Sequence, residues 1–561
     1  MPFARFPRAA RSEAAGEPSP VRALHPRMAL LWAAVSGAAM NLALAPFDAW
    51  WLQAPLLAVL GLLCGLASPA AVLRPGQVAA RAWMFGLGWF GAGWWWLFIS
   101  LHRYGQMPAV LAGLSVALLA AAMALYPALA LAGWARWHAA STSAWRRVAA
   151  WVAWWTLAEL ARGSWFGGFP WSALGYAHTL GPLAAWAPWT GVYGAGAVAC
   201  AVGGALAVAV AAVVRGRRSP AGRGAARFAV PCAALAVALG LALIGRLLPQ
   251  DFSRPAGRLS VSLIQTAVRQ DEKFDAEHLV GHMDTLLRDV AAARGTLVVT
   301  PESAVPLPHG MVDPAWWRLL RQAVRQRPER AALVGVFLGD ESRGYTNSMI
   351  GVSTADDPAR GEAQVYRYGK RHLLPFGESI PPGFGWFVRA LAIPLDSQQH
   401  GDSEAVYVAG GQRLRPLICY EDLFGEEIAV AAAVDEGDPR AATVFVNASN
   451  LAWFGRWMVQ DQHLQFSRMR ALEFQRPVVR ATNTGATAVV DHRGRVTARL
   501  PPEVAGVLET TVDGRTGTTP YARWVHAAGG LWPLWAACAG LLALSLIGDR
   551  RRPTSRRRAA G

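Results

Sequence analysis

The chain has 561 residues, of which 53% are hydrophobic and only 16% are charged. A soluble globular protein carries about 25% charged residues, so this composition excludes a wholly soluble protein. The 26 Trp residues agree with a membrane protein, because Trp concentrates at membrane–water interfaces. The net charge of +17 does not indicate nucleic-acid binding, since the Arg residues lie in short tracts beside apolar runs and no known nucleic-acid-binding signature is present.

Eight apolar runs are candidates for membrane-spanning helices, each of which needs about 20 apolar residues. The first follows an Arg- and Pro-rich segment and precedes further apolar runs, which favours a retained helix over a cleaved signal peptide. The fifth run is short and carries Glu159 and Arg162. In chain order the runs are 28–46, 50–68, 82–101, 108–132, 147–162, 188–214, 228–247 and 524–547.

The Arg residues indicate how these helices are oriented. Arg clusters precede the first helix, follow the second, fourth and sixth, and follow the eighth, whereas the alternate connections carry little charge. By the positive-inside rule, both termini are cytoplasmic and the polar region lies on the opposite side. The predicted layout is a basic cytoplasmic tail (1–27), a seven-helix membrane domain (28–250), an extracytoplasmic domain (251–520), a C-terminal transmembrane helix (521–548) and a second basic cytoplasmic tail (549–561).

The connection at 163–187 begins with a run rich in Gly and aromatic residues, Gly-Ser-Trp-Phe-Gly-Gly-Phe-Pro-Trp at 163–171. Two interpretations remain open. The segment is either an interfacial loop anchored by Trp or a re-entrant segment that lines a lipid entrance. Non-helical backbone at membrane depth must be covered by protein or water in the second case.

The polar region alternates short β-branched runs with helical patterns, which is typical of a layered α/β domain. Helices are expected at about 275–293, 313–327, 424–434 and 457–475. Strands are expected at 259–265, 296–300, 332–338, 344–352, 414–419, 443–447 and 487–491.

Cys419 stands apart from the other four cysteines, because it alone lies in the polar region. It therefore has no intradomain disulfide partner. Cys419 ends a predicted strand and precedes a helical pattern, and the positive end of a helix dipole favours a thiolate. A buried structural cysteine explains the same position equally well.

Glu302 and Lys370 are the two other candidates for chemistry. Glu302 directly follows a buried strand, where α/β sheets tend to place active sites, and a carboxylate there can act as a general base. Lys370 can stabilise a thiolate and a developing oxyanion. Taken singly, each can also be a solvated surface charge.

Together these positions resemble a known family. Pro-Glu-Ser at 301–303, Gly-Lys-Arg-His-Leu-Leu-Pro-Phe-Gly-Glu at 369–378 and Cys-Tyr-Glu at 419–421 resemble the Glu–Lys–Cys triad of the nitrilase superfamily, also called carbon-nitrogen hydrolases. With seven helices before this domain and one after it, residues 28–547 look like the apolipoprotein N-acyltransferase family. The resemblance implies a multi-pass α-helical membrane domain of eight helices joined to a nitrilase-like α-β-β-α sandwich.

The resemblance also implies residue roles. Cys419 would be the nucleophile, Glu302 the general base and Lys370 the stabiliser of the tetrahedral intermediate. The segment 449–455 resembles a family loop, although Leu451 replaces its usual Asp and leaves any polar role there in doubt. Phe274 stands near the place of a frequent family Trp. The supporting or substrate-binding positions are Phe274, Glu378, Tyr420, Glu421, Asn450 and Trp453.

The implied reaction moves a fatty acyl group from a phospholipid to Cys419 as a thioester. The acyl group then passes to the N-terminal α-amine of a diacylglyceryl-cysteine apolipoprotein. The implied location is a bacterial inner membrane with the catalytic domain in the periplasm. No cofactor or metal is expected, because no His/Cys cluster has zinc spacing.

Two alternatives belong to other functional classes. An anchored nitrilase-type amidohydrolase would use the same triad and pass the acyl group to water, but eight helices exceed what tethering needs. A transporter or receptor with a degenerate domain would carry more ionisable groups within its helices.

Overall fold

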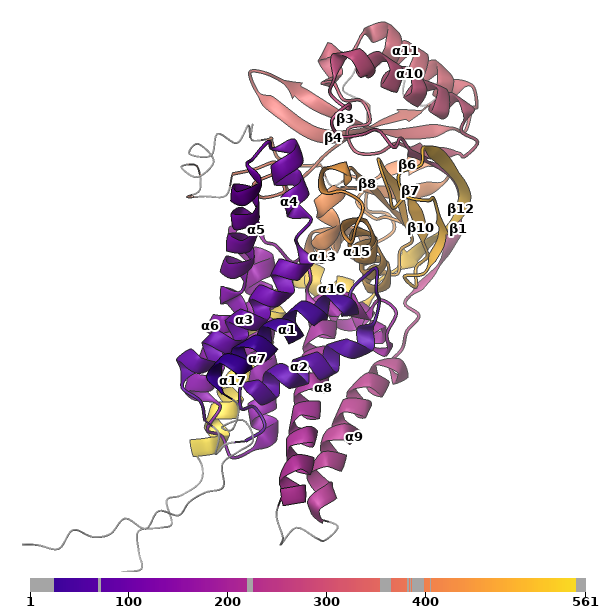
Figure 1. Ribbon diagram of the computed structural model, residues 1–561. Helices are drawn as coiled ribbons and strands as arrows, with labels where there is room; N and C mark the ends of the chain where they lie inside the picture. The colour runs from indigo at the N-terminus through magenta and orange to yellow at the C-terminus, as the bar shows by residue number, and fades with distance from the viewer. Residues whose placement is uncertain are drawn as a thin grey trace, which may run out of the picture.

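The computed structural model describes residues 25–68, 72–218, 226–353, 365–380, 383, 385, 398–403 and 405–550. The two predicted cytoplasmic tails lie almost wholly outside these residues. The chain forms an elongated molecule with a helical part at one end and a two-sheet part at the other (Figure 1).

The helical part contains a helix in each of the eight predicted ranges, and the last strand returns the chain to it (Figure 1). The short helix α4 follows a bend after α3, and the short helix α16 precedes a bend before α17. The bounds are α1 (Pro26–Ala39), α2 (Gln53–Leu63), α3 (Pro75–Gly93), α4 (Leu97–Ile99), α5 (Ala109–Met123), α6 (Leu125–Trp137), α7 (Ala144–Ser164), α8 (Ala187–Arg218), α9 (Ala226–Leu247), α16 (Pro520–Ala528) and α17 (Trp532–Arg550).

The predicted count of eight spans is not confirmed. Within the described residues, three helical stretches are long and apolar enough to cross a membrane: Ala109–Trp137, Pro182–Arg215 and Ala229–Leu247. The number rises to five if the two bent pairs, α3 with the helix after it and α16 with α17, each count as one span. The 11 residues of α2 rise only about 16 Å, against a hydrocarbon core of about 30 Å.

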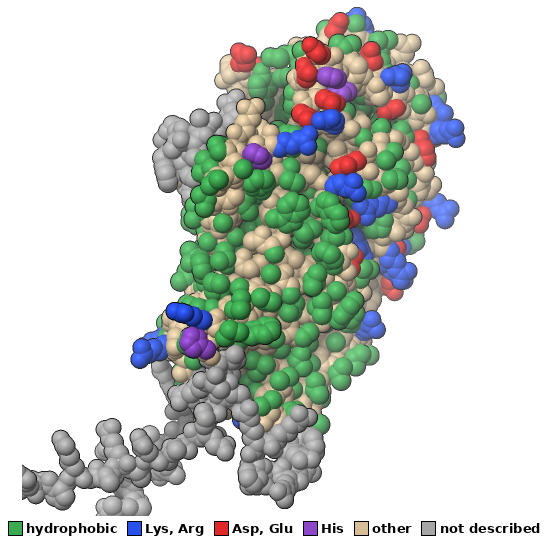
Figure 2. Space-filling model, in the orientation of Figure 1, with side chains coloured by type: hydrophobic (Ala, Val, Ile, Leu, Met, Phe, Trp, Pro, Cys, Tyr) green, Lys and Arg blue, Asp and Glu red, His purple; other side chains and the backbone are tan. Residues whose placement is uncertain are grey.

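The surface of the helical part is apolar. Figure 2 shows hydrophobic side chains across its visible face, whereas acidic and basic side chains gather over the sheets. On α5 and α6, Val110, Leu118 and Leu129 are each more than 60% exposed. An apolar surface of this extent is characteristic of contact with lipid or another apolar partner. The helical part is therefore that of a membrane protein.

The second part consists of two six-stranded sheets with the orders β12-β1-β2-β3-β4-β5 and β11-β10-β9-β8-β7-β6. Strands β1, β2 and β3 run parallel to one another, as do β7, β8 and β9. The bounds are β1 (Ser253–Gln265), β2 (Leu297–Val299), β3 (Ala331–Asp340), β4 (Gly344–Ser353), β5 (Arg367–Gly369), β6 (Tyr407–Ala409), β7 (Gln412–Ile418), β8 (Val444–Ser449), β9 (Val478–Thr482), β10 (Ala488–Val490), β11 (Val496–Arg499) and β12 (Gly506–Gly517).

The two sheets face each other across an apolar layer that includes Leu263, Val299, Ile418 and Val446. The outer face of the first sheet packs against α10 (Ala276–Ala292) and α11 (Pro314–Arg325). The outer face of the second sheet packs against α15 (Val459–Phe474), whose core cluster continues into the membrane helices. This is the α-β-β-α layering of a carbon-nitrogen hydrolase fold.

The differences from the sequence prediction have physical causes. The predicted helix at 424–434 is two short helices, α13 (Gly425–Ile428) and α14 (Val430–Ala433). No strand was predicted for β9, because its sequence contains a charged residue, Arg480. This side chain is fully buried and pairs with Asp422 at 2.9 Å. None was predicted for β12 either, because its half-exposed, Thr-rich sequence lacks an apolar run and is held as a strand by its ladder with β1.

Leu263→Ala is expected to lower the free energy of unfolding by about 2–5 kcal/mol, because a fully buried Leu side chain between the sheets is lost. The measurement is thermal unfolding of the protein in detergent. Leu319→Ala is the matched control, since Leu319 on α11 is 50% exposed and should change stability by less than about 0.5 kcal/mol. Equal effects of the two changes would contradict the assignment of this core.

Candidate active site

The fold brings Glu302, Lys370 and Cys419 together at the carboxyl ends of strands from both sheets. Glu302 follows β2, Lys370 follows β5 and Cys419 follows β7. The Lys370 Nζ atom lies 3.3 Å from Glu302 Oε1, and both Glu302 and Lys370 influence the pKa of the Cys419 thiol. Glu302 and Lys370 are buried, whereas Cys419 is partly exposed and so accessible to a substrate.

Glu302 is fixed in place through both carboxylate oxygens. Asn347 donates from Nδ2 to Oε1 at 2.7 Å, and the Asn450 backbone N–H donates to Oε2 at 2.7 Å. A second buried lysine, Lys273, donates to the Glu302 carbonyl oxygen at 3.1 Å and to Ser303 Oγ at 3.0 Å. These bonds orient the carboxylate toward the thiol.

Lys370 lies between two carboxylates. Its Nζ atom is 2.7 Å from Glu378 Oε1 as well as 3.3 Å from Glu302 Oε1. Burial lowers the pKa of Lys370, but Glu378 and Glu302 outweigh burial and raise that pKa above its ordinary value. Glu378 is itself oriented by the Leu374 backbone N–H at 2.9 Å. Lys370 is therefore a permanent cation beside the thiol.

Cys419 occupies a strained turn. Its φ is +53°, a left-handed conformation that non-glycine residues adopt at a cost and that often marks functional sites. It begins η12 (Cys419–Leu423), a five-residue 3₁₀ turn. The expectation that a helix dipole makes this thiol a thiolate is wrong, because no long helix starts here. Burial and Glu302 instead raise the pKa of Cys419 well above its ordinary range, and Lys370 opposes them.

Glu421 and Tyr420 hold the turn rather than contact the thiol. Glu421 accepts hydrogen bonds from the Ile418 N–H at 2.6 Å, the Arg371 N–H at 2.7 Å and the Tyr368 hydroxyl at 2.8 Å. It therefore ties the loop that carries Lys370 to the turn that carries Cys419. The buried Tyr420 hydroxyl donates to the Gly168 carbonyl at 2.8 Å, which is a contact with the helical part.

The remaining predicted positions surround this centre. Besides its bond to Glu302, Asn450 donates from Nδ2 to Gln270 Oε1 at 2.8 Å. Leu451 is buried, so an apolar side chain fits that position. Trp453 packs edge-on against Tyr104 of the helical part, with the ring centroids 5.6 Å apart. Phe274 is 51% exposed and makes no described contact with Cys419.

Sequence reasoning missed three residues at this centre: Lys273 and Asn347, which contact Glu302, and Gln270, which contacts Asn450. Asn347 bridges the two carboxylates, with Nδ2 at 2.7 Å from Glu302 and 3.5 Å from Glu378. The sequence clue to Asn347 was a polar side chain within a predicted strand. In the structure this strand is β4, and the Asn347 side chain is buried. Lys273 and Gln270 lie in a polar loop, where nothing in the sequence pattern distinguishes a buried lysine from a solvated one.

The raised pKa of Cys419 predicts slow alkylation at neutral pH. The rate of its reaction with iodoacetamide should rise steadily between pH 7 and 9, because only the thiolate reacts. Lys370→Met should slow the reaction at every pH by roughly 10-fold, since it removes the charge that favours the thiolate. Peptide mass spectrometry separates Cys419 from the other cysteines. A rate that is independent of pH, or faster in the variant, would contradict this electrostatic arrangement.

Two family models match separate parts of the chain. Residues 36–205 match the model for the apolipoprotein N-acyltransferase N-terminal domain, and residues 260–521 match the model for carbon-nitrogen hydrolases. Among solved structures, a CN-hydrolase superfamily protein from Xanthomonas campestris is 19% identical and covers 50% of this chain and 97% of its own, with a TM-score of 0.33.

Curated relatives match over most of the chain. Apolipoprotein N-acyltransferase from Verminephrobacter eiseniae is 44% identical over 88% of this chain and 92% of its own length. The protein of the same name from Ralstonia nicotianae is 41% identical over 94% of each chain. With these relatives and both domain models matched, the chain belongs to the apolipoprotein N-acyltransferase family.

Proposed function

We propose that this bacterial membrane protein transfers a fatty acyl group from a phospholipid to the N-terminal α-amine of a diacylglyceryl-cysteine apolipoprotein. The observation that carries the proposal is the Glu302–Lys370–Cys419 cluster, in which the proposed nucleophile, Cys419, is partly exposed. The part of the chain that holds this cluster is attached to an apolar helical part. Both substrates would be anchored in lipid, which accounts for an acyl-transfer site fixed to membrane helices. The names of the relatives do not favour the alternative of an anchored amidohydrolase.

The first half-reaction forms a thioester. Glu302 accepts the proton of Cys419, and the thiolate attacks an ester carbonyl of the phospholipid. Lys370 stabilises the negative oxygen of the tetrahedral intermediate from a water-poor position, where a fixed cation is most effective. The carbon–oxygen bond then breaks, and the departing lysophospholipid takes the proton from Glu302.

The second half-reaction consumes the thioester. The neutral α-amine of the apolipoprotein attacks the thioester carbonyl, Lys370 again stabilises the oxyanion, and Glu302 accepts a proton from the attacking nitrogen. The carbon–sulfur bond breaks, and Cys419 recovers its proton from Glu302. Each half-reaction returns Glu302 to its carboxylate form, so one base serves both steps.

The proposed topology has eight membrane passages, both termini in the cytoplasm and the two-sheet part in the periplasm. Its support is the alternation of Arg clusters along the chain and the presence of a helix in each predicted range. The short helices α1 and α2 would then cross the bilayer together with the 3₁₀ turns that flank them, η1 (Met40–Ala43) and η2 (Trp50–Leu52).

Intact mass of the purified protein after incubation with phospholipid tests the first half-reaction. The protein should gain one acyl-chain mass, and hydroxylamine should remove it, because a thioester is expected. Cys419→Ser should lower the rate of amine acylation by at least about 1,000-fold, as the loss of a covalent nucleophile does in other acyl-transfer enzymes. A Cys419→Ser protein that turns over normally would sink the assignment of the nucleophile.

Glu302→Gln is expected to slow formation of the acyl-enzyme by about 100- to 10,000-fold, the usual contribution of a general base. The side chain keeps its size and its contact with Asn450, so the fold should persist. Single-turnover mass spectrometry measures the rate. Acyl groups that appear mainly as free fatty acid, with an apolipoprotein peptide present, would instead support the amidohydrolase.

Labelling in intact spheroplasts tests the topology. A membrane-impermeant maleimide should react with Val280→Cys, at a 65% exposed position on α10, before the cells are opened. Thr142→Cys, at an exposed position between α6 and α7, should react only after lysis. The wild-type chain supplies the background from its native cysteines. The reverse pattern of labelling would contradict a periplasmic catalytic part.

A further inference from the structure

The Gly- and aromatic-rich segment at 165–175, here called the bridging loop, follows α7 and contacts the turn that carries Cys419. Its middle and its C-terminal end are held by one turn of α7. Arg162 donates to the Phe169 and Trp171 carbonyl oxygens, the latter at 2.7 Å, and Glu159 accepts the Leu174 N–H at 2.9 Å. Arg162 and Glu159 are both buried. Both charged side chains therefore bind backbone groups of the loop.

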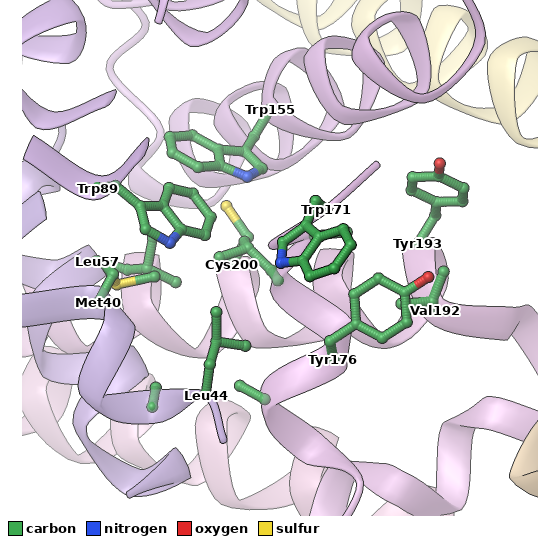
Figure 3. Packing of buried hydrophobic residues seen from close by; sticks show 14 of the residues in the cluster. Met40, Leu44, Leu57, Trp89, Trp155, Trp171, Tyr176, Val192, Tyr193 and Cys200 are labelled. Atoms are coloured by element: carbon green, nitrogen blue, oxygen red, sulfur yellow. The ribbon is translucent and has the colours of Figure 1, made fainter. Parts of the chain in front are cut away.

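The tip of the bridging loop binds the catalytic part at two points. The Gly168 carbonyl accepts from the Tyr420 hydroxyl, and the Gly167 carbonyl accepts from His372 Nε2, each at 2.8 Å. Tyr420 is adjacent to Cys419, and His372 lies two residues after Lys370. Further along the loop, Trp171 donates to Gln462 of α15 at 2.7 Å and packs on Phe466. Trp171 and Tyr176 lie side by side in this core (Figure 3).

His372 must donate from both ring nitrogens. A carbonyl oxygen only accepts, and on the other side of the ring Nδ1 lies 2.7 Å from the Glu427 carboxylate. The ring also stacks on Phe424 with centroids 3.4 Å apart, and Tyr420 lies at 5.8 Å. Burial lowers the pKa of His372, but the hydrogen bond and charge of Glu427, with Glu421 farther off, raise that pKa above its ordinary value.

The glycines of the tip are required by geometry. Gly168 has φ of +68°, and a Cβ atom there would lie 2.2 Å from the Gly163 carbonyl oxygen. The two carbonyls can face His372 and Tyr420 because the chain turns in this glycine-only conformation. The sequence left open whether this segment is an interfacial loop or a lipid-lining one. The contacts indicate a third role, which is to hold His372 and Tyr420.

We propose that the bridging loop sets the geometry of the active site from within the membrane part, with Arg162 and His372 as positioning residues. The proposal rests on the proposed acyl transfer only for its activity readout. The loop fixes the Lys370 loop through His372 and the Cys419 turn through Tyr420. Releasing it separates the cation from the thiol while the substrate-binding surfaces stay in place.

His372→Phe tests this directly, because it keeps the stacked ring and removes both hydrogen bonds. Its kcat should fall by roughly 10- to 100-fold with KM nearly unchanged, the size expected when charge-assisted hydrogen bonds are lost. Alkylation of Cys419 by iodoacetamide should also slow by at least about 3-fold, since Lys370 moves away. Wild-type alkylation and kcat in this variant would overturn the proposal. The alkylation assay needs no acyl donor, so it remains valid even if wild-type protein fails to form an acyl-enzyme and the proposed function is wrong.

Glu427→Gln tests the pH dependence of the rate, which would not change if His372 had only a structural role. It retains a hydrogen-bonding partner but removes the charge that raises the pKa of His372. The rate of acyl-enzyme formation should therefore begin its decline on the basic side at lower pH than in wild type. An unshifted decline would contradict a positioning role for charged His372.

Arg162→Lys and Arg162→Met test the other end of the loop. Lys can still donate to the two carbonyls and should retain more of kcat and of the alkylation rate than Met. Arg147→Lys is the matched control, because Arg147 is a buried Arg at the opposite end of α7 that also donates to backbone carbonyls; it should leave both rates near wild type. If Arg162 variants do not fold, Gly168→Ala replaces them, with Gly113→Ala in α5, where a Cβ atom meets nothing within 4 Å, as its control. Equal rates in each pair would overturn the proposal.

Discussion

The buried ammonium of Lys370, held between Glu302 and Glu378, is the interaction on which the rest of this site depends. An unpaired cation at that depth would be strongly destabilising, and the two carboxylates could not approach each other without it. The three groups therefore stabilise one another in their ionised forms. Asn347 extends this mutual dependence, since one side-chain amide contacts both carboxylates.

This charge arrangement explains why the thiol can remain protonated at rest. A permanent thiolate would add a further buried negative charge beside Glu302. Lys370 already balances the charges of two carboxylates. The raised pKa of Cys419 therefore keeps the proton on sulfur at neutral pH. A reactive thiol that is masked in this way is also protected from adventitious oxidation, which requires the thiolate.

Much of this organisation was predictable from sequence, and the exceptions share a cause. Glu302 and Cys419 each follow a short apolar run, so these two strand ends could be located. Lys370 follows the short strand β5, Arg-Tyr-Gly, which was not predicted, and it was recognised by its motif alone. The helix dipole at Cys419 was wrongly expected because an apolar pattern at 424–434 does not reveal that α13 and α14 are separate four-residue helices. The partners Lys273, Gln270 and Asn347 were missed because burial of a polar side chain is decided by tertiary contacts. The eight-span count rested on apolar runs and on the alternation of Arg clusters, and α2 shows that an apolar run can contain a helix that is by itself shorter than a full span.

The pairing of the first strand with the last has a consequence for how the protein is made. Ser253 of β1 faces Gly517 of β12, so the chain leaves the membrane part and returns to it at adjacent points. The catalytic part is thus an insertion into a helical protein, with neighbouring entry and exit strands. Because β12 is synthesised last among the strands, the first sheet stays incomplete until nearly the whole polar region has been synthesised. Strand β12 closes the edge of the sheet that carries Glu302 and Lys370, so their final positions beside Cys419 are completed only late in biosynthesis.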